Sequence, residues 1–204
     1  MKREWKREQT LRLLLDTTSR LVEEKGCVKT TMSEIMRHSG LSKGAIFHYV
    51  KSKDELLSMV LEQQMAETDR RFREAIEKGG PTFEGPMGEI ASGLPAVAEN
   101  NVANRIFRYL LGRSDEPEVG ELVARFYDKT VRTSVSWIEA GQSHGVIPAS
   151  IDARRAAETF VLLSNGLRMR SGLPTKEGVL APEDVAAFIR SVLQPGQTKG
   201  ERQG

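Results

Sequence analysis

Residues 30–56 read TTMSEIMRHSGLSKGAIFHYVKSKDEL, and their spacing predicts two short helices joined by a tight turn. Thr31 and Glu34 have the spacing of a capping box, in which each side chain satisfies an amide donor of the first helical turn. Gly40 can end that helix because glycine adopts the left-handed conformation without steric cost. Ser42 can then accept from the amides that begin the second helix. The stretch therefore predicts a helix, a glycine turn and a second helix.

Two helices joined by a short glycine-containing turn form a helix-turn-helix, whose second helix lies in the major groove of DNA. Here the second helix is expected over residues 42–49, and it begins with short or basic side chains that allow a close approach to base edges. Polar and basic groups nearby suit phosphates, which set affinity and register, while base contacts set sequence choice. The residues predicted to contact DNA are Thr30, Thr31, Ser42, Lys43, Gly44, Ala45, His48, Tyr49, Lys51 and Lys53.

The same stretch resembles the DNA-binding segment of the TetR family of bacterial transcriptional regulators. The residues in register with the family pattern are Thr30, Thr31, Ile35, Gly40, Ser42, Gly44, Tyr49, Lys53 and Leu56. Three positions depart from it. Met36 stands where the family usually has alanine, Phe47 replaces a tyrosine and cannot donate to a phosphate, and Val50 replaces a phenylalanine, which should change only packing.

The resemblance implies an all-α fold, with an N-terminal three-helix domain that contains the helix-turn-helix and a larger helical domain for ligand binding and dimerisation. We place the DNA-binding domain at residues 1–50 and the second domain at residues 51–204. In this family a small molecule usually binds in the larger domain and releases the DNA. The resemblance also implies that the last two helices of this chain pair with their copies in a second subunit.

Helical spacing of apolar residues predicts helices along the whole chain. A long helix over residues 52–78 would join the two domains. Glycine and proline between residues 79 and 88 predict a flexible connection, and Pro95 should kink the helix that follows. The tail from residue 195 is expected to be disordered. The other expected helices cover residues 10–24, 102–112, 115–143, 152–170 and 182–193.

Apolar side chains of the larger domain suggest a lipophilic ligand, since such sites are mostly apolar. The predicted ligand-lining residues are Phe72, Leu94, Phe107, Tyr109, Phe126, Tyr127 and Trp137. From the resemblance, the predicted dimer residues are Ala156, Phe160, Leu163, Leu167, Val185, Phe188, Ile189 and Val192. A two-fold dimer would place a second reading helix about one turn of DNA away. Both sets could instead be plain core, because apolar residues at helical spacing usually are.

Charge is unevenly distributed along the 204 residues. Residues 1–60 hold 12 Lys and Arg against 8 Asp and Glu, a balance of +4, whereas residues 61–204 hold 18 against 20, a balance of −2. The basic excess belongs to the part assigned to DNA. Residues 2–7, KREWKR, could form an arm that reaches a phosphate or the minor groove, or could be a frayed first turn. The sequence leaves both open.

Other classes of protein find little support in the sequence. It has neither a run of about 18 apolar residues nor a signal-peptide pattern, so no membrane span or secretion is predicted. The single Cys27 suits a reducing cytoplasm and is expected to be a buried small side chain rather than a redox sensor. His38, His48 and His144 lack metal-ligand spacing, and no phosphate loop or nucleophile elbow occurs. We therefore predict no metal, no cofactor and no enzyme activity.

The predicted function is that of a DNA-binding transcriptional regulator. It would act as a homodimeric repressor that binds a palindromic operator and is released by a small molecule. Two alternatives stay open. One is a same-fold activator or a regulator without a ligand, and the other is a helical small-molecule carrier or enzyme with a vestigial DNA reader. Salt-dependent DNA binding would separate the second alternative from a true reader.

Overall fold

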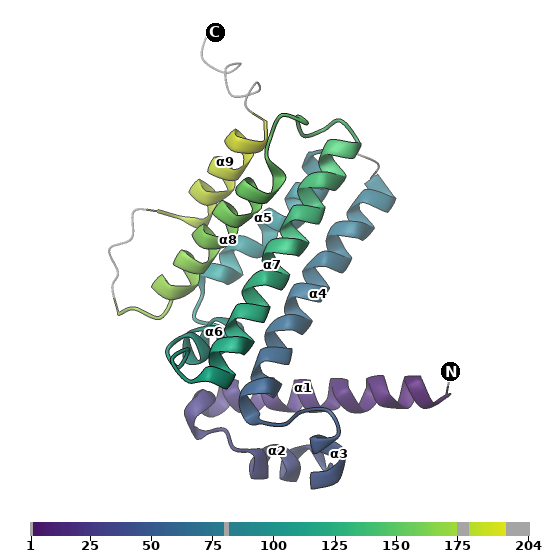
Figure 1. Cartoon of the computed structure of the whole chain (residues 1–204), viewed down its shortest axis with the longest axis vertical. Helices are drawn as coiled ribbons and strands as arrows, with labels where there is room; N and C mark the ends of the chain where they lie inside the picture. Colours follow the sequence, from purple (N-terminus) through teal and green to yellow (C-terminus); the bar gives the residue numbers. More distant parts are fainter. Residues whose placement is uncertain (1, 80–81, 175–179, 195–204) are drawn as a thin grey trace. The chain divides into compact units, whose positions relative to one another are not determined.

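The computed structural model describes residues 2–79, 82–174 and 180–194, and over these ranges the chain forms helices and no strand (Figure 1). In chain order the helices are α1 (Lys2–Lys29), α2 (Met32–Ser39), α3 (Lys43–Phe47), α4 (Lys53–Gly79), α5 (Glu84–Ala98), α6 (Val102–Leu111), α7 (Pro117–Ser143), α8 (Ala153–Arg170) and α9 (Pro182–Leu193). The predicted all-α fold is confirmed. The expected disordered tail from residue 195 falls outside the described residues.

Several helices differ from their expected limits. α1 begins at Lys2 rather than at residue 10, and it kinks at Gly26, where φ is 80°. α3 ends at Phe47 rather than at residue 49. α5 runs through Pro95 as one helix to Ala98. A proline removes one amide donor from the helix, and α5 continues beyond it until the backbone becomes extended at Glu99.

The described chain packs as two compact units. The first unit comprises residues up to 64 together with 100–126, and the second comprises residues 65–99 and those from 127 onward. α4 and α7 each contribute to both units. This division follows packing and does not coincide with the boundary at residue 50, which we drew for function and which stays a prediction.

Each unit has its own hydrophobic core. In the first unit the core is formed by residues of α1, α2, α3, the first half of α4, α6 and the start of α7. Its fully buried residues include Leu14, Ile35, Ile46, Leu56 and Ile106. In the second unit the core joins α5, α8 and α9, the helices that contact one another most in this unit, with the end of α7. The helix-turn-helix is thus held by long helices on its inner side.

Candidate DNA-binding surface and effector pocket

The N-terminus of α2 is fixed by a complete capping box. The Thr31 hydroxyl accepts from the Glu34 amide at 3.3 Å, and the Glu34 carboxylate accepts from the Thr31 amide at 3.2 Å. Gly40 ends the helix in the left-handed conformation, with φ 69°, and its amide donates to the Met36 carbonyl at 3.0 Å. The start and stop predicted for this helix are confirmed.

Glu34 also connects α2 to α1. Its carboxylate pairs with the Lys25 ammonium on α1. The hydrogen bond from Lys25, together with those from Thr31, lowers the pKa of Glu34 from 4.5 to about 2. The carboxylate is therefore ionised at neutral pH, and the charge pair and the cap hold α2 at one orientation on α1.

The short helix α3 has one buried side and one exposed side. The Ser42 hydroxyl caps it by accepting from the Ala45 amide at 3.2 Å, as predicted. Ile46 is fully buried and anchors the helix in the core of the first unit. Lys43 and Gly44 lie exposed on the outer side. This arrangement leaves the outer face of α3 open for a partner.

The outer face of α3 continues past the end of the helix. The Lys43 ammonium lies 5.8 Å from the centre of the Phe47 ring, one turn further along. His48 is exposed and meets the half-buried Tyr49 edge-on, with 5.4 Å between ring centres. Lys51 is exposed as well. The structure thus brings basic and aromatic side chains together around α3, whose first turn also contains the small residues Gly44 and Ala45.

Two of the predicted DNA-contacting residues have partners inside the first unit instead. Thr30 is fully buried, and its hydroxyl donates to the Gly26 carbonyl at 2.9 Å. The Lys53 ammonium donates to the Cys27 carbonyl at 2.9 Å and lies 5.0 Å from the centre of the Tyr109 ring. Both residues hold the end of α1 next to the helix-turn-helix.

Cys27 is buried, as expected from the sequence. Burial raises the pKa of its thiol to about 11, and the nearby Lys53 charge opposes that rise only in part. The thiol is therefore protonated at neutral pH, whereas reactivity requires the thiolate.

The predicted ligand-lining residues divide between the two packing units. In the first unit Phe107 and Phe126 face each other at 6.4 Å, and Tyr109 contacts Lys53 and Arg113. In the second unit Phe72 packs against Trp137 at 5.3 Å. A shared role of the set in lining a ligand site stays a prediction.

Polar groups of the second-unit candidates also have partners. The Trp137 indole donates to Asp69 at 2.8 Å, and the Tyr127 hydroxyl donates to Glu158 at 3.2 Å. Leu94 is the member of the predicted set that lines the pocket described next.

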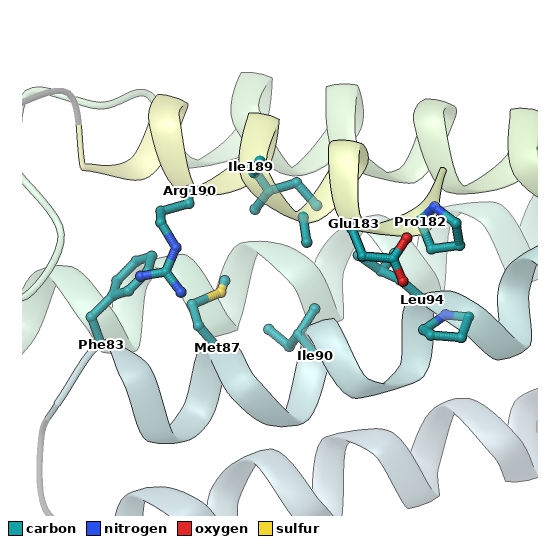
Figure 2. A pocket seen from close by; sticks show the side chains of 11 residues that line it. Phe83, Met87, Ile90, Leu94, Pro182, Glu183, Ile189 and Arg190 are labelled. Carbon is teal, nitrogen blue, oxygen red and sulfur yellow. The ribbon is translucent and has the colours of Figure 1, made fainter. Parts of the chain in front are cut away.

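A pocket of about 340 Å³ lies between α5 and α9, within the second unit (Figure 2). Its walls are mostly apolar, and the small side chains of Ala186 and Ala187 leave space opposite the larger residues of α5. The lining residues are Phe83, Met87, Ile90, Leu94, Pro95, Pro182, Glu183, Ala186, Ala187, Ile189 and Arg190. The volume falls at the small end of the range for ligand sites.

A charge pair lies beside the pocket. The Arg190 guanidinium on α9 donates to the Glu84 carboxylate on α5 at 2.5 and 3.0 Å and lies 5.5 Å from the centre of the Phe83 ring. The hydrogen bonds from Arg190 lower the pKa of Glu84. Figure 2 shows Glu183 near the opposite end, beside Pro182. The positive charge of Arg190 at this pocket is thus balanced by the carboxylate of Glu84.

The predicted dimer residues lie mainly in the core of the second unit. Ile189 lines the pocket, and Leu163 and Val192 are half-buried. The members that are buried within the chain itself are Ala156, Phe160, Leu167, Val185 and Ile189. Phe188 is 46% exposed.

Other apolar residues of α8 are open to a partner. Leu162 is 57% exposed and Met169 is 45% exposed, with the exposed Gly166 between them on the same side of the helix. These three residues are four and three positions apart, which places them on one face of a helix. This spacing could have been found in the sequence.

The described residues contain no group of histidine, cysteine and acidic side chains that could hold a metal ion. No helix among them is both long and apolar enough to cross a bilayer.

Comparison with known proteins assigns the DNA-reading part. The sequence model described as "Bacterial regulatory proteins, tetR family" matches residues 14–60, which include all of α2 and α3, the second part of α1 and the start of α4. Residues 14–60 therefore carry a TetR-family DNA-binding segment, and this segment contains the helix-turn-helix of α2 and α3.

Curated relatives named as HTH-type transcriptional regulators align over most of the chain. The regulator BetI 2 of Chromohalobacter salexigens is 27% identical over 174 residues, which cover 83% of this chain and 80% of the relative. The regulator EthR of Mycolicibacterium smegmatis is 23% identical over 182 residues, covering 88% and 82%. Both are named as transcriptional regulators rather than enzymes.

Solved structures share the fold. Salmonella enterica GusR superposes with a TM-score of 0.63 at 21% identity and covers 91% of this chain and 95% of its own. The reduced form of E. coli NemR gives 0.64 at 16% identity and covers 90% and 97%. At these identities the likeness concerns the fold alone.

The three departures from the TetR pattern have clear positions in the structure. Val50 is 2% exposed, so the replacement of the family's phenylalanine by valine changes the packing of the core. Met36 is half-buried against the same core. Phe47 is 44% exposed beneath Lys43, where the family's tyrosine would present a hydroxyl.

Proposed function

We propose that this TetR-family regulator is a repressor that binds a palindromic operator as a homodimer and leaves it when a small lipophilic molecule binds. The observation that supports this most is the exposed face of α3, where Lys43 and Gly44 are exposed while Ile46 is buried in the core. A helix anchored on one side and lined with small or basic residues on the other suits the major groove.

The DNA contacts divide by chemistry. Ser42, Lys43, Gly44 and Ala45 meet base edges, with the Lys43 ammonium suited to guanine acceptors. The groups that bind phosphates are Thr31, His48, Tyr49 and Lys51. Thr30 and Lys53 act indirectly, because their polar groups bond to the end of α1 and so fix the position of the reading unit.

Dimerisation uses the outer faces of α8 and α9. Leu162, Met169 and Phe188 are large apolar side chains that are about half exposed in the single chain. Burying them removes apolar surface from water, and Gly166 allows another helix to come close. A two-fold dimer doubles the number of DNA contacts and gives the operator its palindromic symmetry.

The effector binds in the pocket between α5 and α9. Its lining is apolar apart from Glu183 and Arg190, and Arg190 is neutralised by Glu84. An uncharged lipophilic molecule therefore meets the least desolvation cost there. α4 contributes to both packing units and follows the helix-turn-helix directly in the chain, so in this proposal it is the helix through which occupancy of the pocket changes the separation of the reading helices. The effector must bind the released state more tightly than the DNA-bound state.

Selection of bound DNA from a random-duplex pool tests this proposal. The purified protein should enrich a palindrome with half-sites about one turn apart. A promoter that contains the palindrome should be transcribed less in the presence of the protein. Increased transcription would identify an activator. A carrier or enzyme with a vestigial reader would enrich no sequence and show no steep salt dependence of DNA binding.

A further inference from the structure

The first two turns of α1, residues 2–9, are unusually basic and form part of a continuous helix. We call them the α1 leader. The side chains of Lys6 and Arg7 are exposed, as are those of the neighbouring positions 5, 8 and 9. In Figure 1 the leader is the end of α1 nearest the N-terminus. The sequence alone left open whether this segment is an arm or a frayed turn.

The α1 leader carries more basic than acidic residues. Basic residues occupy positions 2, 3, 6 and 7, and acidic residues occupy positions 4 and 8, so its net charge is +2. Lys6 and Arg7, whose side chains the structure describes, are adjacent on the helix, about 100° apart, and both are exposed.

A direct contact connects the leader to the end of the reading helix. The Tyr49 hydroxyl donates to the Arg7 carbonyl at 3.5 Å. Tyr49 also meets His48 edge-on, immediately after α3. The second turn of α1 is thus positioned beside the residues to which we assign phosphate contacts.

We propose that the α1 leader binds the DNA phosphate backbone beside the half-site read by α3. This inference rests on the proposed function, since it adds a second contact surface to the same DNA complex. The minor groove is about 6 Å wide, which is too narrow for a helix about 10 Å across, so the leader meets phosphates rather than base edges. Its contribution is to affinity and not to sequence choice.

The expected size of the effect follows from counterion release. Each neutralised phosphate of duplex DNA contributes about 0.9 to the slope of log affinity against log salt. Lys6 and Arg7 together should therefore account for a slope of about 1.8. Between 50 and 200 mM salt, a loss of that slope changes the relative affinity of wild type and variant by about tenfold.

The test compares two double variants with the same change in charge. Lys6→Ala/Arg7→Ala removes the basic groups of the leader, and alanine keeps the helix because it is the best helix former. Arg12→Ala/Arg20→Ala removes two exposed charges further along α1 and serves as the matched control. Circular dichroism confirms that both variants remain helical.

We expect Lys6→Ala/Arg7→Ala to lower affinity for the selected palindrome at 50 mM salt, to reduce the salt slope by about 1.8 and to enrich the same half-site as wild type. Hydroxyl-radical footprints should shorten at the outer edge of each half-site. The control pair should match wild type in each respect.

Failure of the inference is distinct from failure of the proposed function. If wild type enriches no palindrome, the proposed function is wrong. If wild type does, but the leader variant keeps the wild-type slope and footprint, the leader does not bind DNA. If the leader variant enriches a different half-site, the phosphate assignment is overturned. If Arg12→Ala/Arg20→Ala lowered the salt slope equally, the effect would come from the net charge of the protein rather than from the leader, and the inference would be overturned.

Discussion

The ammonium of Lys53 donates a hydrogen bond to the main-chain carbonyl of Cys27 at 2.9 Å, and this contact fastens the start of α4 to the end of α1. The pattern position occupied by Lys53 suggests a phosphate contact from sequence alone. We propose a positioning role for this residue, since its ammonium also lies over the Tyr109 ring.

Lys53→Met separates these two roles because it keeps the apolar stem and removes the charge. We expect the variant to lose about 1.5–3 kcal/mol of unfolding free energy, which hydrogen bonds from charged groups typically contribute. Urea denaturation measures this loss. The salt slope of DNA binding should stay at the wild-type value. A slope lower by about 0.9 with unchanged stability would instead identify a direct phosphate contact.

Gly44→Ala tests whether the outer face of α3 meets DNA. A Cβ at this position would touch no other atom of the described chain within 4 Å. Alanine should therefore raise the unfolding free energy, by up to about 1 kcal/mol. Specific DNA binding should fall about tenfold, because the added methyl displaces the helix from the base edges.

Gly88→Ala is the matched control for this experiment, because Gly88 is also an exposed helical glycine with open space around its Cβ position. It should leave DNA affinity unchanged. Wild-type affinity in Gly44→Ala would mean that α3 does not enter the groove closely.

The Glu34 carboxylate should make the stability of the helix-turn-helix depend on pH. Its folded pKa, about 2, lies below its ordinary value of 4.5, so the ionised form is favoured by folding. The resulting stabilisation is present above pH 4.5 and is lost as the pH falls towards 2. Unfolding midpoints of wild type and Glu34→Gln should therefore differ by a constant amount near neutrality and converge in acid. A difference that stays the same at pH 3 and pH 6 would contradict this assignment.

Leu162→Glu should produce a folded monomer. Leu162 is 57% exposed in the single chain, so the substitution is compatible with the monomer fold but places a charge in the proposed interface. Light scattering after size exclusion should show a halved mass, and binding to the palindrome should weaken. Leu13→Glu changes another half-exposed leucine, on α1, and should leave the mass unchanged. A dimeric Leu162→Glu protein would place the interface elsewhere.

Ala186→Phe should fill the pocket between α5 and α9. Nile red, an uncharged lipophilic dye, should bind wild type with increased fluorescence and should not bind this variant, while DNA affinity is kept. Ala124→Phe enlarges an exposed alanine of α7 and should bind the dye like wild type. Equal dye binding by Ala186→Phe and wild type would exclude this pocket as the lipophilic site.

Local signals in the sequence predicted the helix-turn-helix well. The roles of Thr31, Gly40 and Ser42 depend on hydrogen bonds to residues at most four positions away, so the sequence contains what is needed to infer them. The kink of α1 at Gly26 lies two residues past the end expected at residue 24, and its positive φ suits glycine.

The pocket and the exposed faces could not be inferred in this way. Val185, Phe188 and Ile189 are all apolar, and spacing alone does not show that Ile189 turns towards α5 while Phe188 stays exposed. Similarly, the bond from the Thr30 hydroxyl to the Gly26 carbonyl depends on how α1 ends, and that is decided by packing.

Sequencing of the DNA that wild type and Lys43→Ala retain from one random-duplex pool tests the central claim most directly. If α3 reads bases through Lys43, wild type should enrich a palindrome, and the variant should enrich the same palindrome with one position relaxed in each half-site, at a cost of about 1–3 kcal/mol. Identical sequence preference in both proteins, or no enrichment by wild type, would contradict the account.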